Sequence, residues 1–177
     1  MECIEKSSLA ELHDTFQKMR EFQLTHNALK KDIEHLYSLT INANNPPAIL
    51  AALIRTCHKE FFSLVEGDLY LINQFNPYTG YSDRDPMVAK FKKTYRHHTQ
   101  VFKKHGLYEK FQSASFQSFL LLTEKRHGFT HPKGRQSLLA KQEDLLLFDA
   151  VFLAYNDHIN ALMANVGVSV EVPLFGN

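Results

Sequence analysis

The sequence contains little cysteine, proline or glycine, no tryptophan and no long hydrophobic run. Of its 177 residues, two are cysteine, six are proline and seven are glycine. Two cysteines cannot form a disulfide scaffold, and neither belongs to a C-x-x-C pair. The longest nearly apolar stretch, Leu145 to Tyr155, is interrupted by Asp149 and is shorter than the roughly 18–20 residues of a membrane span. The composition therefore favours neither a disulfide-rich nor a membrane-spanning protein.

Several chemical motifs are also missing. The sequence has no Gly-rich phosphate loop, no nucleophilic serine or cysteine motif and no paired-carboxylate spacing, which argues against nucleoside-triphosphatases, most hydrolases and glycosidases. The first residues, MECIEKSSL, lack the positive start and apolar block of a secretion signal. With 44% hydrophobic and 22% charged residues, we expect one globular domain over residues 1–177, reduced and cytoplasmic.

Positive charge is concentrated in one part of the chain. Residues 84–135 hold twelve Lys and Arg against three acidic residues, a net charge of +9, so the remainder carries −8 within a total of +1. Such asymmetry favours a polyanion partner, with RNA or a nucleotide expected first. A solvated helix face is the alternative. The expected nucleic-acid-binding residues are Lys92, Lys93, Arg96, Lys103, Lys104, Lys125, Lys133 and Arg135, with Tyr95 or Tyr108 either stacking a base or lying in the core.

Apolar residues recur at three- and four-residue steps over most of the chain, which predicts an all-α bundle of four to five helices. The expected core helices span about 8–39, 45–75, 86–105, 107–126 and 142–166. Ser8 and Glu11 match a capping box at the start of the first helix, and Asn45 is suited to cap the second. The tail 167–177 is expected to be extended, as a short strand or as an arm on a neighbour.

The last expected helix has an unusually wide apolar face. Leu146, Val151 and Leu153 flank its main apolar stripe. This extra width is typical of a dimer surface, although a central, well-buried helix has the same pattern.

The most informative segment is Glu124-Lys-Arg-His-Gly-Phe-Thr-His-Pro132. On an unbroken helix Arg126 and His131 would project about 140° apart. Gly128 and Pro132 predict that the helix ends between them, so that both side chains can turn toward one polar spot. Arginine supplies a permanent planar donor for phosphate, and histidine supplies an acid or base near neutral pH. Together they are sufficient for metal-free cleavage of RNA.

The pattern Arg126-His127-x-x-x-His131-Pro132 resembles the R-x4–6-H motif of HEPN domains (higher eukaryote and prokaryote nucleotide-binding). HEPN proteins are compact helical bundles, often dimers in which the motifs of two protomers meet at one cleft. Many are metal-independent ribonucleases that act as toxins or in defence against phage. Others are inactive scaffolds or nucleotide-binding partners.

The resemblance implies a role for each matching residue. Arg126 would bind the phosphate, His131 would be the general acid and base, and His127 would shape the pocket. An acidic residue on an earlier helix often accompanies the motif, and Glu66 is the candidate, with Asp68 a poorer one. The implied activity is an endoribonuclease without cofactor that leaves 2′,3′-cyclic phosphate ends, works as a homodimer and, if it is a toxin, has a cognate antitoxin protein.

Other interpretations of these residues stay open. Arg126 fits a helix C-terminus, where cations are favoured, and His131 and Glu66 have ordinary surface roles available. His127 and His131 also have a metal-ligand spacing, but no third ligand is visible. The whole protein is alternatively a non-catalytic scaffold that binds RNA, a nucleotide or a protein, or a module that self-associates through its charge asymmetry.

Overall fold

The computed structural model describes residues 2–42, 44–104 and 106–164, with side chains from residue 9 onward. Within these residues the chain forms six α-helices, one short 3-10 turn and no strand, which confirms the all-α class. The helices are α1 (Glu2–Thr40), α2 (Pro47–Phe75), α3 (Met87–Val101), α4 (Leu107–Ala114), α5 (Phe116–Thr130) and α6 (Gln142–Met163), and the 3-10 turn is Arg135–Leu138. The expected extended tail 167–177 lies outside the described residues.

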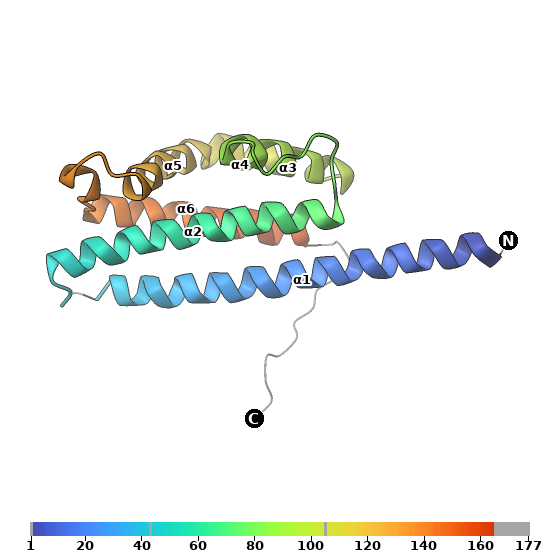
Figure 1. Ribbon diagram of the computed structural model, residues 1–177, viewed down its shortest axis with the longest axis horizontal. Helices are drawn as coiled ribbons and strands as arrows, with labels where there is room; N and C mark the ends of the chain where they lie inside the picture. The colour runs from blue at the N-terminus through green and yellow to red at the C-terminus, as the bar shows by residue number, and fades with distance from the viewer. Residues whose placement is uncertain (1, 43, 105, 165–177) are drawn as a thin grey trace, which may run out of the picture.

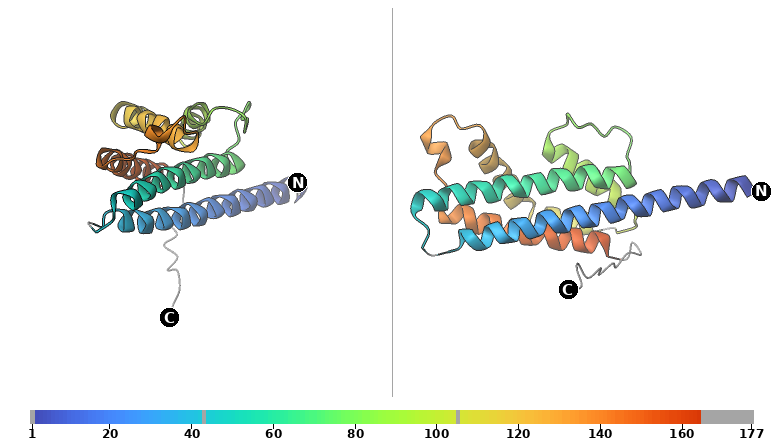
Figure 2. Two further views of the ribbon diagram at one scale, coloured as in Figure 1. Left: turned by 60° about the vertical axis from the view of Figure 1, so that its left-hand side comes forward. Right: turned by 60° about the horizontal axis from the view of Figure 1, so that its bottom comes forward.

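The helices form three layers. The long helices α1 and α2 run antiparallel along each other (Figure 1). Figure 2 shows α2 and α6 side by side, with α1 on one side of them and α3, α4 and α5 on the other. No helix in the described part of the chain is long and apolar enough to cross a membrane.

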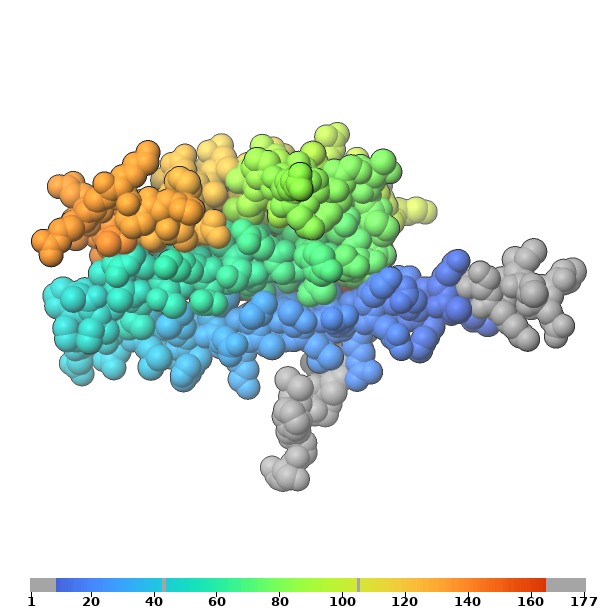
Figure 3. All heavy atoms as spheres, viewed as in Figure 1, coloured from blue at the N-terminus to red at the C-terminus, as the bar shows by residue number. Residues whose placement is uncertain are grey.

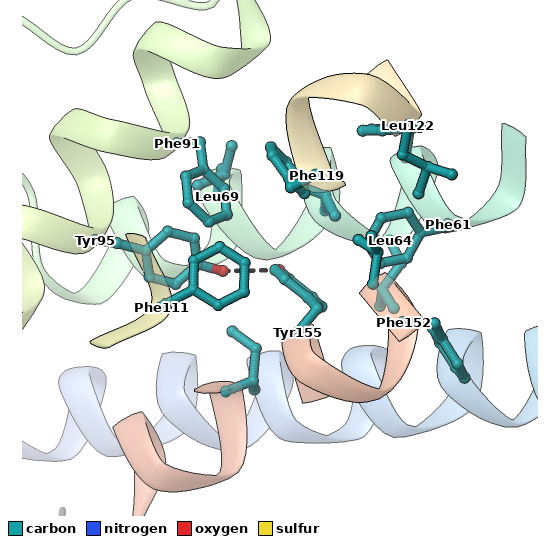
Figure 4. Close-up of a cluster of buried hydrophobic side chains, with 14 of the residues drawn as sticks. Phe61, Leu64, Leu69, Phe91, Tyr95, Phe111, Phe119, Leu122, Phe152 and Tyr155 are labelled. Carbon is teal, nitrogen blue, oxygen red and sulfur yellow. Dashed lines mark hydrogen bonds between the residues drawn. The ribbon is translucent and has the colours of Figure 1, made fainter. Parts of the chain in front are cut away.

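An aromatic cluster fills the space between the middle layer and the layer of α3 to α5 (Figure 4). Phe61 of α2 is fully buried and meets the rings of Phe119 and Tyr155 edge-on, with centroids 6.4 and 5.4 Å away. Phe91 of α3 lies 4.6 Å from the ring of Phe119. Edge-on and tilted pairs are the favoured aromatic geometries, so this cluster fixes α2, α3, α5 and α6 relative to one another.

A buried polar network crosses the same core. The Asp68 carboxylate of α2 accepts hydrogen bonds from the Tyr155 hydroxyl at 2.7 Å and from His26 Nδ1 at 2.8 Å. Because Tyr155 gives its single hydroxyl hydrogen to Asp68, the Tyr95 hydroxyl donates to Tyr155 across 2.7 Å. The network joins α1, α2, α3 and α6 through one carboxylate.

The first helix begins earlier than the sequence pattern predicted. It starts at Glu2, so Ser8 lies inside the helix and does not cap it. Residues 2–6 include glutamate and lysine, which favour helix, and one serine inside a helix costs only about 0.5 kcal/mol. The N-terminal part of α1 runs past the end of the bundle in Figure 1, and Figure 3 shows this for the residues of α1 from 9 onward. Three apolar side chains of this part are exposed: Leu9, Leu12 and Phe16.

Asn45 does not cap the second helix. Its side-chain Nδ2 donates to the carbonyl oxygens of Leu39 and Thr40, at 2.7 and 3.3 Å, and so satisfies the end of α1. The N-cap position of α2 is Pro46, and Pro47 opens the helix. The turn between the two helices thus supplies hydrogen-bond donors to the last carbonyl groups of α1, which have no partner within the helix.

The helix expected over residues 107–126 differs in two ways. It is divided at Ser115 into α4 and α5, and α5 continues through Gly128 to Thr130. The helix ends between Arg126 and His131, at Thr130, as the sequence predicted, although Gly128 lies inside it. Phe129 is buried, with its ring 5.1 Å from that of His58 on α2. Burying a phenylalanine contributes about 2 kcal/mol, which exceeds the cost of about 1 kcal/mol for glycine inside a helix.

Candidate functional site

Arg126 projects from α5 toward α2, where an acidic and an aromatic residue meet it. Its Nη2 atom lies 3.6 Å from Glu66 Oε1, and its guanidinium carbon lies 5.9 Å from the centre of the Phe62 ring. Phe62 and Glu66 are four residues apart on α2 and therefore share one helix face. This spacing could have identified Phe62 from the sequence once Glu66 was chosen.

The Arg126–Glu66 ion pair is loose and accessible. The side chain of Arg126 is 33% exposed and that of Glu66 is 43% exposed, and 3.6 Å is longer than a charge-assisted hydrogen bond. The Nε atom of Arg126 is buried and has no hydrogen-bond partner among the described residues. Because the Arg126 side chain is one third exposed and only loosely paired, its guanidinium is suited to bind an anion such as a phosphate oxygen.

His127 and His131 lie together at the C-terminal end of α5. Both are exposed, and their ring centres are 5.1 Å apart. His131 directly follows the last helical turn, and its backbone N–H donates to the His127 carbonyl at 2.9 Å. The Thr130 hydroxyl donates to the Arg126 carbonyl at 2.9 Å, which closes the helix end. The continuous helix thus fixes both histidines on one side.

Arg126 and His131 make their contacts with different partners. No hydrogen bond, ion pair or ring contact joins the two residues in the described part of the chain. The expectation that both turn to one spot stays a prediction. Arg126 is grouped with Glu66, and His131 is grouped with His127.

The other acidic candidate is excluded by its position. Asp68 is buried within the hydrogen bonds to His26 and Tyr155, and burial raises the pKa of its carboxyl. It therefore has no access to a substrate. Among the described residues, no group of three or more histidine, cysteine, aspartate and glutamate side chains is arranged to hold a metal ion. The His127–His131 pair therefore has no third ligand there.

Two of the expected RNA-binding lysines make intramolecular contacts. Lys104 Nζ donates to the carbonyl oxygens of Ala161, at 2.7 Å, and Ala164, and burial lowers its pKa. It closes the C-terminal end of α6, which sequence reasoning could not foresee because the partners lie more than fifty residues away. Lys125 Nζ forms an ion pair with Asp144 Oδ1 at 2.8 Å and links α5 to the start of α6.

The remaining basic candidates are at the surface. They are Lys92, Lys93 and Arg96 on α3, Lys103 in the turn after α3, and Lys133 and Arg135 after α5. Tyr95 and Tyr108, proposed for base stacking, are both buried, so their role is core packing. Tyr95 belongs to the hydrogen-bonded network of Asp68.

The wide apolar face of α6 is divided between core and surface. Val151 is buried, whereas Leu146 and Leu153 are 62% and 57% exposed. Asp144 pairs with Lys125 and so faces α5, whereas Leu146, two residues further along α6, projects from a different side of the helix.

Comparison of the chain with known protein families, with curated proteins and with solved structures finds no match. The resemblance to HEPN proteins thus rests on the motif from Arg126 to Pro132 and on the helical context.

Proposed function

We propose that this protein is a metal-independent endoribonuclease of the HEPN type. The observation that carries the proposal is the set of groups at the end of α5. Arg126, with an accessible fork and an acidic partner, lies within five residues of two exposed histidines whose rings adjoin. Phosphate binding and proton transfer are thereby available at one helix end without a metal ion.

The proposed reaction uses the 2′-hydroxyl of RNA as the nucleophile. The His131 imidazole takes the hydroxyl proton, the 2′-oxygen attacks phosphorus, and the bond from phosphorus to the 5′-oxygen breaks. The protonated imidazole returns a proton to the leaving 5′-oxygen. Arg126 neutralises the negative charge on the non-bridging oxygens, and His127 orients His131. The products are a 2′,3′-cyclic phosphate and a 5′-hydroxyl.

Glu66 acts in this proposal as a positioning residue. It holds the Arg126 guanidinium over Phe62 when no substrate is bound. Because the pair is loose and exposed, a phosphate can bind the Arg126 guanidinium beside the carboxylate, or in its place, at little cost in free energy.

In a homodimer, Arg126 of one copy and the proton-transferring histidine of the other would act on one phosphate. The exposed Leu146 and Leu153 of α6 offer apolar surface for such a pairing. The proposed setting is the cytoplasm, with toxin or phage-defence activity and, for a toxin, an antitoxin as a further partner.

The alternative is a non-catalytic module on the same fold that binds RNA, a nucleotide or a protein. It is favoured by the same ion pair, because Glu66 offsets the charge of Arg126. In that case Arg126→Ala weakens binding and no strand is cut.

The test is cleavage of an end-labelled, mixed-sequence single-stranded RNA in EDTA. We expect Arg126→Ala and His131→Ala each to reduce the rate about 10²–10³-fold, as loss of a charge-stabilising or proton-transferring group does. Lys59→Ala, which removes an exposed cation on α2, is the control and should retain the wild-type rate. Full activity in Arg126→Ala contradicts the proposal, and binding without cleavage by the wild type selects the scaffold.

A further inference from the structure

Two open hollows adjoin each other on the surface around α3. The first, of about 420 Å³, lies between α3 and α4 and is lined by Lys92, Lys93, Arg96, Tyr108, Glu109 and Gln112. The second, of about 510 Å³, lies between α3 and the preceding loop and is lined by Lys93, Arg96, His97, Gln100 and residues 78–80. Lys93 and Arg96 border both hollows.

The cations at these hollows are not all neutralised. Lys93 Nζ contacts Asp85 at 2.9 Å, and Lys92 Nζ lies 4.9 Å from the centre of the Phe116 ring. The Arg96 guanidinium makes no hydrogen bond or ion pair within the described residues, although it stands between the two hollows. An arginine in this position offers its whole donor fork to an anion.

The second hollow also has an aromatic and polar wall. The Tyr78 ring lies 5.7 Å from that of His97, and its hydroxyl is buried without a hydrogen-bond partner in the described residues. Cations beside ring faces are the combination with which proteins hold single strands, since phosphates take the cations and bases stack on the rings. A duplex hides its base faces, and a membrane surface would favour a flat rather than a hollowed face.

The position of the hollows relative to Arg126 follows from the contact between Lys92 and Phe116. Phe116 is the first residue of α5, and Arg126 lies ten residues further along the same helix, or about 15 Å along its axis. The hollow bordered by Lys92 thus lies toward the start of α5, and Arg126 lies near the end of the same helix.

We propose that the hollows at Lys93 and Arg96 form a second binding surface for single-stranded RNA, separate from the Arg126 site. The inference rests on the proposed ribonuclease function for its substrate class. With about 3.4 Å per stacked nucleotide, a strand needs roughly five nucleotides to bridge 15 Å. A long strand therefore contacts both places, whereas a trinucleotide bound at Arg126 does not reach the hollows.

The test measures binding independently of cleavage. The probes are a fluorescent 20-nucleotide single strand of 2′-O-methyl RNA, which has no free 2′-hydroxyl to react, and the trinucleotide of the same chemistry. Lys93→Ala/Arg96→Ala should raise the Kd for the 20-nucleotide strand about tenfold and make the slope of log K against log salt less negative by about 1.4. The trinucleotide Kd should change less than about twofold.

The matched control is Lys31→Ala/Lys59→Ala, which removes two exposed cations from α1 and α2. Both double variants alter only surface residues, so equal melting temperatures are expected and verified. An unchanged Kd for the long strand, an equal loss in the control, or equally tight and equally Arg96-dependent binding of a 20-base-pair duplex overturns the proposal. Failure of wild type to bind the long strand overturns it as well.

The outcome separates this surface from the ribonuclease proposal. If binding of the long strand depends on Arg96 and ordinary RNA is not cleaved, the proposed binding surface is supported and the proposed ribonuclease function is contradicted. If cleavage depends on Arg126 and the Lys93→Ala/Arg96→Ala variant binds the long strand as tightly as wild type, the ribonuclease proposal stands and the proposed binding surface is contradicted.

Discussion

Glu66 and Asp68 lie two residues apart on α2, yet their surroundings are opposite. Asp68 is buried and joins four helices through His26, Tyr155 and, beyond it, Tyr95. Glu66 is 43% exposed and, among the described residues, forms one ion pair, with the Arg126 guanidinium at 3.6 Å. The same chemical group therefore specifies the fold at one position and remains available to a ligand at the other.

The difference follows from the helical period. Two residues along an α-helix turn the side chain through about 200°, so a carboxylate that points into the bundle is followed by one that points away from it. The chemistry of a candidate site is consequently drawn from the outer face, and substitutions there should alter activity while those on the inner face should alter stability.

The largest effect is expected for Asp68→Ala. Removing the carboxylate leaves His26 and Tyr155 buried without their partner, and breaking such a buried pair costs about 3–5 kcal/mol in the free energy of unfolding. Urea titration followed by circular dichroism measures this change. An equal loss of stability in Glu66→Ala would erase the distinction between the two carboxylates.

Acidification should destabilise the interior next. Burial lowers the pKa values of His58, His98 and His158 to about 4, 3 and 4. Because the unfolded chain binds protons on these residues near pH 6.5 and the folded chain does not, stability is present above pH 6.5 and is lost as the pH falls toward 4. The loss by pH 5.5 is about 1.4 kcal/mol per histidine, offset in part at lower pH by the raised pKa of Asp68.

Melting curves at pH 7.5, 6.5 and 5.5 measure this dependence. Replacing His158 by phenylalanine removes one of the three groups and should flatten the curve by about a third. A melting temperature that is constant from pH 7.5 to 5.5 contradicts the burial of neutral histidines.

A smaller effect on stability is expected for Lys104, whose role differs from that of the neighbouring basic residues. Lys104→Ala removes the donor to the carbonyls at the end of α6 and should lower the free energy of unfolding by about 1 kcal/mol, the value of one hydrogen bond. The Kd for single-stranded RNA should stay within about twofold of wild type. A tenfold loss of RNA affinity at unchanged stability would instead place Lys104 among the binding residues.

The smallest effect on stability is expected for Glu66→Gln. The Arg126 pair is partly exposed, and such pairs contribute less than about 1 kcal/mol. The melting temperature should therefore hardly change, while the KM for RNA changes because Arg126 loses the carboxylate that positions it. A destabilisation as large as that of Asp68→Ala would show that the pair is structural.

Most of the fold could be predicted from periodicity. The three- and four-residue steps gave the helical class and the approximate limits of α2, α3 and α6. The errors occurred where a local signal competed with packing. The expected helix bound at residue 126 fell short of the observed end at Thr130, because the burial of Phe129 against His58 continues the helix through Gly128.

The candidate site was predictable only in part. The motif and the acidic residue could be named, and Glu66 does lie beside Arg126. The separate partners of Arg126 and His131 depend on tertiary contacts. The capping role of Lys104 joins residues far apart in the sequence, and the hollow beside Tyr78 depends on how the loop before α3 folds back on that helix, so no local pattern predicts either.

The central claim is that the end of α5 cuts RNA without a metal ion, and the termini of the products test it most directly. Wild-type protein is incubated with 5′-labelled single-stranded RNA in EDTA, and the new 3′ ends are examined by their sensitivity to phosphatase before and after acid opening of the ring. The account predicts 2′,3′-cyclic phosphates from wild type and none from Arg126→Ala or His131→Ala. Fragments with 3′-hydroxyl ends, or cleavage by either variant at the wild-type rate, would contradict it.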